Sequence, residues 1–168
     1  MVSGTKKIAL GGMLCVLCIF SLYLAVHLPT NRIFFYGLSS VFASIIMIEG
    51  GTKWAFIFYG ATSILGMLLI PNKLGVVPYG LFFGLYGIVK YYIEGIANII
   101  LQLLLKGGFF ILGMGGTAIL LQELFMTEVT SRLSIWALTV IGLAIFYLYD
   151  YVYTRFVHYY ETVLRKKL

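Results

Sequence analysis

The chain has 168 residues, of which 61% are hydrophobic, 17% aromatic and only 11% charged. A soluble globular domain usually carries about a quarter charged residues, and a domain of about 150 residues leaves about 30% of its unfolded surface in contact with solvent. So much apolar surface excludes a soluble enzyme and a nucleic-acid-binding module. The composition therefore predicts an integral membrane protein, surrounded by the lipid bilayer and without a nucleic-acid partner.

Six charge-poor apolar runs follow one another along the chain. A helix that crosses a bilayer needs about 20 residues, so six such helices use about 120 residues and leave room only for short loops. Proline and glycine stand in these loops, where they end helices. The sequence thus predicts an all-α polytopic membrane protein, a single domain in which six transmembrane helices form a compact bundle. The predicted spans are residues 8–27, 33–49, 54–71, 74–91, 104–125 and 133–154.

The basic residues predict the orientation in the membrane, because cytoplasmic loops carry an excess of Lys and Arg. If the N-terminus is cytoplasmic, Arg32, Lys73 and Arg132 lie outside. The basic residues then expected inside are Lys6, Lys7, Lys53, Lys90, Arg155, Arg165, Lys166 and Lys167. We therefore expect a multi-pass protein of the plasma membrane with both termini in the cytoplasm.

A polar stripe precedes the fifth span. Glu94, Asn98, Gln102 and Lys106 recur every four residues, which places them on one side of an otherwise apolar helix. The stretch 92–105 either lies along the membrane interface or begins a long, tilted span. We favour an interfacial start that runs into the span at Gly107.

Small residues recur on one face of the third and fourth predicted helices. Such residues let helix backbones approach closely within a membrane, so these faces are predicted to pack against neighbouring helices. The residues are Gly60, Ser63 and Gly66 in the third helix and Gly80, Gly84 and Gly87 in the fourth.

The first helix presents a similar face, which contains Gly11, Cys15 and Cys18. A metal site would need further soft or imidazole ligands nearby, and His27 and His158 stand elsewhere in the sequence. The sequence therefore predicts no metal and no cofactor, and we interpret this face as a docking surface for another membrane helix. No hydrolase, zinc-protease or phosphate-binding motif is present in the sequence, so no catalytic residue is predicted and the protein is not expected to be an enzyme.

Charged and polar residues near the ends of the spans suggest two further features. Asp150 is expected to pair with Lys90, Lys106 or Arg155, because an unpaired charge is costly in a membrane. A rim of polar and aromatic residues is predicted at the outer face, where a small molecule from outside would bind. The rim comprises Asn31, Arg32, Tyr36, Asn72, Lys73, Tyr79 and Glu123.

With these features the chain resembles the substrate-binding S component of energy-coupling factor (ECF) transporters, which are ABC importers. The resemblance rests on six compact spans, a basic C-terminus and three local sequences. These are the stretch from Lys6 to Gly12, the loop Pro29-Thr30-Asn31-Arg32 and the glycine-bearing helix from Val77 to Gly87.

The resemblance implies that a vitamin-like small molecule is captured at the outer face and delivered through a T subunit and two ATPase subunits. Asn31 and Arg32 are the first candidates for contacting the substrate, together with Tyr36, Asn72, Tyr79 and Glu123. In that family the first helix docks on the T subunit through an Ala-x-x-x-Ala motif. Gly11 and Cys15 stand in place of its alanines, and Ala9, Gly11, Cys15 and Cys18 are the corresponding docking candidates.

Two alternatives stay open. The first is a membrane scaffold that transports nothing, similar to the rod-shape-determining MreD family, in which the glycine faces would bind other helices. The second is a small channel or carrier. Such proteins often place ionisable groups near the middle of the membrane, whereas the charges here are predicted at the ends of the spans.

Overall fold

The computed structural model describes residues 4–120 and 135–164, which divide into two compact units. Unit 1 comprises Met1–Gly95 and unit 2 comprises Ile96–Leu168. The described residues form helices and short connections and contain no strand, which confirms the all-α prediction. The two units are described separately below.

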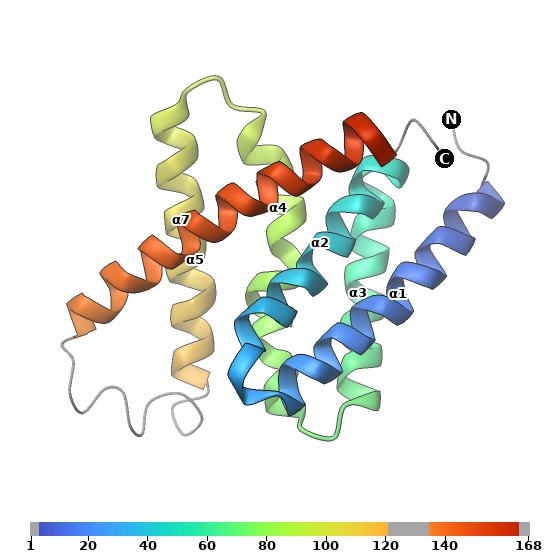
Figure 1. The fold of residues 1–168 in the computed structure, drawn as a ribbon, viewed down its shortest axis with the longest axis horizontal. Coiled ribbons are helices and arrows are strands. Elements are labelled where there is room, and N and C mark those ends of the chain that lie inside the picture. Colours follow the sequence, from blue (N-terminus) through green and yellow to red (C-terminus); the bar gives the residue numbers. More distant parts are fainter. Residues whose placement is uncertain (1–3, 121–134, 165–168) are drawn as a thin grey trace. The chain divides into compact units, whose positions relative to one another are not determined.

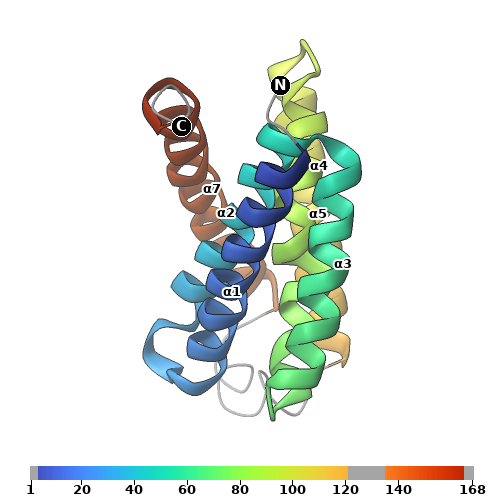
Figure 2. The same ribbon diagram turned by 90° about the vertical axis from the view of Figure 1, so that its right-hand side faces the viewer.

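Unit 1 contains four long helices joined by short connections, coloured blue to yellow-green in Figures 1 and 2. Helix α1 packs against α2 and α3, and α2 also packs against α3 and α4. The bounds are α1 Gly4–His27, η1 Pro29–Asn31, α2 Arg32–Gly50, α3 Thr52–Leu69, η2 Lys73–Val76, η3 Tyr79–Phe83 and α4 Gly84–Glu94. Successive helices run in opposite directions, so the connections between them gather at two opposite ends of the unit. We call the end that holds η1 and η2 the rim end, and the end where α1 and α3 begin the lysine end.

The turn between α2 and α3 depends on one residue. Gly51 has a φ of 83°, in the region that glycine adopts without a steric penalty. Its N–H donates to the carbonyl oxygen of Met47 at 2.9 Å, which closes the end of α2. Helix α3 begins at the next residue, Thr52. This single-residue reversal sets α2 and α3 side by side.

The glycine faces pack closely at some positions and not at others. A Cβ added at Gly84 would lie 2.8 Å from the ring of Tyr59 and 2.9 Å from the ring of Tyr79, so only glycine fits there without a shift. A Cβ added at Gly66 would lie 3.1 Å from the side chain of Val76 in η2, a tight contact that a small shift could relieve. A Cβ at Gly60 or Gly80 would meet nothing within 4 Å, so the prediction of close packing is wrong for these two residues. The small residues of one helix face therefore differ in how closely they pack.

Helix α4 is preceded by one turn of π-helix, η3. A π-helical turn breaks the regular hydrogen-bond pattern and needs other donors for its carbonyl groups. The hydroxyl of Tyr59 on α3 donates to the carbonyl oxygen of Gly80 at 2.7 Å. This bond ties the irregular turn to α3 and leaves η3 and α4 as one membrane-length segment.

The described residues of unit 2 form α5, Ile99–Leu120, and α7, Ile135–Tyr159, followed by the π-helical turn η4, Tyr160–Leu164. Asn98 caps α5, because its Oδ1 accepts the backbone N–H of Ile100 at 3.0 Å. The helix then runs through Gly107 and Gly108 without interruption. Phe110 and Phe146 stack between α5 and α7 with ring centroids 4.7 Å apart.

Six helical segments in residues 4–120 and 135–164 are long and apolar enough to cross a membrane. They also expose large apolar side chains: Val16 on α1 is 69% exposed, Leu68 on α3 69% and Leu112 on α5 77%. Such surfaces suit contact with lipid rather than water. The prediction of six apolar helices of membrane-spanning length is confirmed, which indicates a multi-pass membrane protein. The orientation of the termini and the plasma-membrane location stay predictions.

Candidate functional site

Two of the residues predicted to bind substrate hold the rim end of unit 1 together. The hydroxyl of Tyr36, one turn into α2, donates to the carbonyl oxygen of Gly75. Asn72 caps η2, because its Oδ1 accepts the N–H of Gly75 at 3.3 Å. The connection between α3 and α4 is therefore fixed against the start of α2.

Asn31 and Arg32 lie at the same end of unit 1, in η1 and at the first position of α2. Asn31 is exposed. The Nε of Arg32 is buried and has no hydrogen-bond partner among the described residues, although a buried N–H group in a folded protein nearly always has one. Arg32 stands four residues before Tyr36, which places both on the same face of α2. The rim end thus combines a fixed loop with the guanidinium of Arg32, whose buried Nε–H donates to no described residue.

Tyr79 lies deeper in the unit and is fully buried. Its hydroxyl is 2.7 Å from Oγ1 of Thr62 on α3 and accepts the thiol of Cys18 on α1 at 3.5 Å. These bonds join α1, α3 and η3 through neutral groups. The structure therefore places the Tyr79 hydroxyl inside the helix bundle of unit 1, and Glu123, the last rim candidate, lies outside the described residues.

The candidate docking residues on α1 have different surroundings. Ala9 is exposed, Gly11 and Cys15 are half-buried, and Cys18 is buried. A Cβ at Gly11 would meet nothing within 4 Å. Of the four, Ala9, Gly11 and Cys15 are open to contact with another molecule.

A cavity of about 290 Å³ lies at the lysine end of unit 1, between the first half of α1, the last turn of α2 and the first half of α3. This volume is close to the lower limit for ligand pockets, which span about 300–1,000 Å³. The lining includes Lys7, Gly11, Cys15, Glu49, Trp54 and Phe58. Sequence reasoning did not predict this cavity. Gly11-Gly12 and the charged turn around Glu49 were signals, but three separate helix segments are needed to form it.

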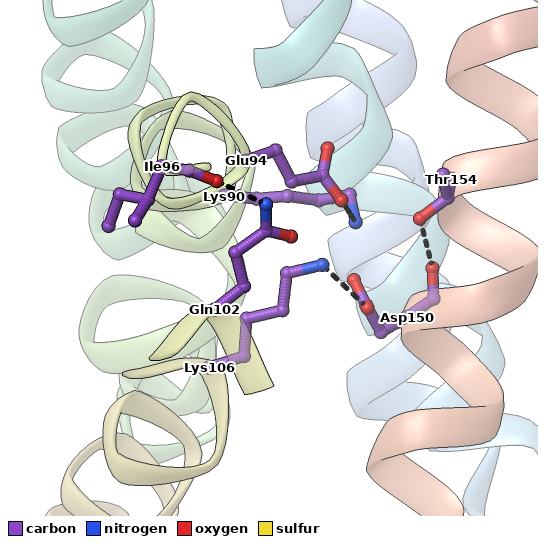
Figure 3. A network of polar contacts seen from close by, with 7 residues as sticks. All are labelled: Lys90, Glu94, Ile96, Gln102, Lys106, Asp150 and Thr154. Carbon is purple, nitrogen blue, oxygen red and sulfur yellow. Dashed lines mark hydrogen bonds and ion pairs between the residues drawn. The ribbon is translucent and has the colours of Figure 1, made fainter. Parts of the chain in front are cut away.

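Two ion pairs, each within a single unit, are drawn in Figure 3. In unit 2, Lys106 Nζ on α5 and Asp150 Oδ2 on α7 are 2.8 Å apart, and these side chains are only 6% and 11% exposed. In unit 1, Lys90 pairs with Glu94 on α4 at 2.5 Å. Asp150 thus pairs with Lys106, one of its three predicted partners, and both residues lie inside membrane-length helices.

The backbone carbonyl oxygen of Asp150 also accepts the hydroxyl of Thr154 at 2.8 Å, as Figure 3 shows. The hydroxyl of Tyr147 donates to the carbonyl oxygen of Leu103 at 3.0 Å. In the described part of unit 2, an ionic contact and a neutral hydrogen bond therefore join α5 to α7. Their geometry is that of a structural link between two apolar helices.

The described residues contain no group of three or more His, Cys, Asp and Glu side chains that could hold a metal ion. Comparison with protein-family models, with curated proteins and with solved structures gave no significant match to the chain. The candidate site is therefore argued from its own geometry.

Proposed function

We propose that the protein is the substrate-binding S subunit of an ECF-type ABC importer. It captures a vitamin-like small molecule at the rim end of unit 1 and delivers it through a T subunit and two ATPase subunits. The resemblance of the sequence motivates this proposal, and the six apolar helices agree with it.

The observation that carries the proposal is the unused donor of Arg32. Its Nε is buried and has no partner in the described part of the chain, and leaving such a donor unsatisfied costs about 1–3 kcal/mol or more. An acceptor oxygen on a bound molecule would satisfy the donor, and an anionic group would also interact with the guanidinium charge. The proposed substrate therefore carries a carboxylate, a phosphate or a comparable polar group.

The fixed loop supports the same proposal. Because Tyr36 and Asn72 both form hydrogen bonds with Gly75, the loop between α3 and α4 is fixed at the rim end without a ligand. A site that is organised in advance loses less conformational freedom on binding. Asn31, exposed in η1, is the second polar contact in this proposal.

Docking on the T subunit is proposed to use the accessible part of α1. Ala9 is exposed and Gly11 is half-buried with open space around its Cα. A helix of the T subunit could approach closely here, because small residues permit close contact between membrane helices.

The proposal is tested by co-purifying the full chain with the T and ATPase subunits of its host. We expect a stoichiometric complex that Ala9→Leu weakens, because the larger side chain separates the two helices. The matched control is Ala144→Leu, which makes the same change at an exposed residue of α7. The absence of any complex with the wild-type chain would overturn the proposal and favour the scaffold alternative.

A further inference from the structure

We propose that the cavity at the lysine end of unit 1 binds an acyl chain of an anionic phospholipid, whose headgroup lies at Lys7 and Lys53. The cavity is separate from the rim end. It shares Gly11 and Cys15 with the face of α1 that is proposed to dock on the T subunit, so the inference applies to the chain without that subunit.

The cavity walls suit an acyl chain. Lys7 and Glu49 are the charged residues in its lining, and the remaining walls are glycine, cysteine, aliphatic and aromatic side chains from α1, α2 and α3. A water-soluble ligand would find few polar partners there, whereas an acyl chain needs none. An acyl chain would also fill space that the glycines of α1 leave open, since a Cβ at Gly11 or Gly12 would meet nothing within 4 Å.

The margin of the cavity also faces the surroundings of the protein. Ile8 on α1 and Ile57 on α3 both line the cavity, and they are 64% and 62% exposed. Because α1 and α3 are long and apolar enough to cross a membrane, their exposed apolar faces contact lipid. A lipid chain can therefore enter sideways between α1 and α3.

The charges select an anionic headgroup. Lys7 lines the cavity and Lys53 is exposed in the first turn of α3, at the same end of the unit. Glu49 is the acidic residue of the lining and offsets one of these two positive charges. Lys90 and Glu94 at the end of α4 pair with each other and add no net charge. The lysine end therefore has an excess of positive charge. Each Lys near a membrane surface strengthens binding to anionic lipid by about 1 kcal/mol.

The experiment uses the fluorescence of Trp54, which lies in the cavity wall. The chain has two tryptophans, so Trp136→Phe leaves Trp54 as the only one. The full chain is reconstituted into vesicles that contain phosphatidylglycerol or phosphatidylcholine with brominated acyl chains, which quench a nearby tryptophan. We expect brominated phosphatidylglycerol to quench Trp54 with about fivefold higher apparent affinity, the ratio that corresponds to about 1 kcal/mol.

Two pairs of variants distinguish quenching by lipid in the cavity from quenching by the bulk lipid around the protein. Gly11→Leu fills the cavity and should lower the quenching by both lipids, whereas Gly60→Leu makes the same change in open space outside the cavity lining and should not. Lys7→Gln should remove most of the preference for phosphatidylglycerol, whereas Lys73→Gln, an exposed lysine at the rim end, should leave it intact.

Three results would overturn the inference. They are equal quenching by the two lipids, quenching by both that Gly11→Leu leaves unchanged, and a preference for phosphatidylglycerol that soluble glycerol phosphate abolishes. The last result would assign the charge to a free phosphate instead of a lipid. The chain is measured without T or ATPase subunits, so a failure here is distinct from a failure of the importer proposal.

Discussion

The two units join their helices by different polar contacts. In unit 1 the contacts are hydrogen bonds between neutral groups. Tyr36 and Tyr59 each donate to a backbone carbonyl oxygen, and the Tyr79 hydroxyl forms hydrogen bonds with Thr62 and Cys18. In unit 2 a buried ion pair between Lys106 and Asp150 lies between the two long helices. Unit 1 therefore distributes its polar contacts over several elements, whereas much of the link in unit 2 depends on one charged pair.

This difference determines where each unit is sensitive to mutation. A neutral hydrogen bond between membrane helices contributes on average about 0.6 kcal/mol, so unit 1 should tolerate the loss of any one hydroxyl. A buried charge that loses its partner is far more costly. The comparison therefore predicts a large loss of stability from breaking the ion pair in unit 2. In unit 1 it predicts a smaller loss from steric overlap and small losses from removing single hydroxyl groups.

The largest effect is expected from breaking the ion pair. Asp150→Asn removes the carboxylate that lies 2.8 Å from the Lys106 ammonium and should lower the free energy of unfolding by about 3–5 kcal/mol. Thermal unfolding of the purified protein in detergent measures the change. The control Glu161→Gln removes an exposed acid of η4 and should change the stability by less than about 0.5 kcal/mol.

A double variant sharpens this prediction. Lys106→Met combined with Asp150→Leu removes both charges and should recover most of the stability, because replacing a buried pair by apolar residues is often neutral. If Asp150→Asn alone were harmless, the ion pair would not be an important link between α5 and α7, and the contrast between the units would disappear.

A smaller loss is expected from Gly84→Ala in unit 1. The new Cβ would lie 2.8 Å from the ring of Tyr59 and 2.9 Å from that of Tyr79, and overpacking of this kind typically costs about 1–3 kcal/mol. Gly80→Ala is the matched control, because a Cβ there meets nothing within 4 Å. Equal melting temperatures for the two variants would show that α3 and η3 are not packed as described.

The smallest effect is expected from Tyr79→Phe, which removes one hydroxyl and keeps the ring. The loss should be about 0.6 kcal/mol and not exceed about 1.7 kcal/mol. A double-mutant cycle with Thr62→Val isolates the bond between the two hydroxyls, which are 2.7 Å apart. A coupling energy as large as the effect of Asp150→Asn would contradict the distinction between neutral and ionic links.

Much of the fold could be predicted because lipid imposes strong local rules on sequence. The apolar runs, with proline and glycine between them, were sufficient to predict six helices and the break between residues 49 and 54, where the structure has the turn at Gly51. The partner of Asp150 was predicted only as one of three residues, because Lys106 is 44 positions away and the sequence alone does not bring α5 beside α7. Gly60 and Gly84 looked alike in sequence, yet only Gly84 meets other side chains.

The candidate site was less predictable for the same reason. Tyr79 follows a proline and was assigned to the rim, but the turn of η3 directs its hydroxyl to Thr62 and Cys18. The cavity at the lysine end requires α1, α2 and α3 together. Contacts between distant segments decide both features, and local patterns in one sequence do not show which segments meet.

The central claim is that Arg32 holds a small molecule at the rim end of unit 1. Mass spectrometry of the compounds retained by the purified full chain tests it most directly, with Arg32→Gln compared with Arg155→Gln, which removes an exposed arginine of α7. A hydrogen bond to a charged group contributes about 1.5–3 kcal/mol, so Arg32→Gln should lower retention at least about tenfold and Arg155→Gln should not. A compound retained equally by the wild type and both variants, or no retained compound in any of them, would contradict the account.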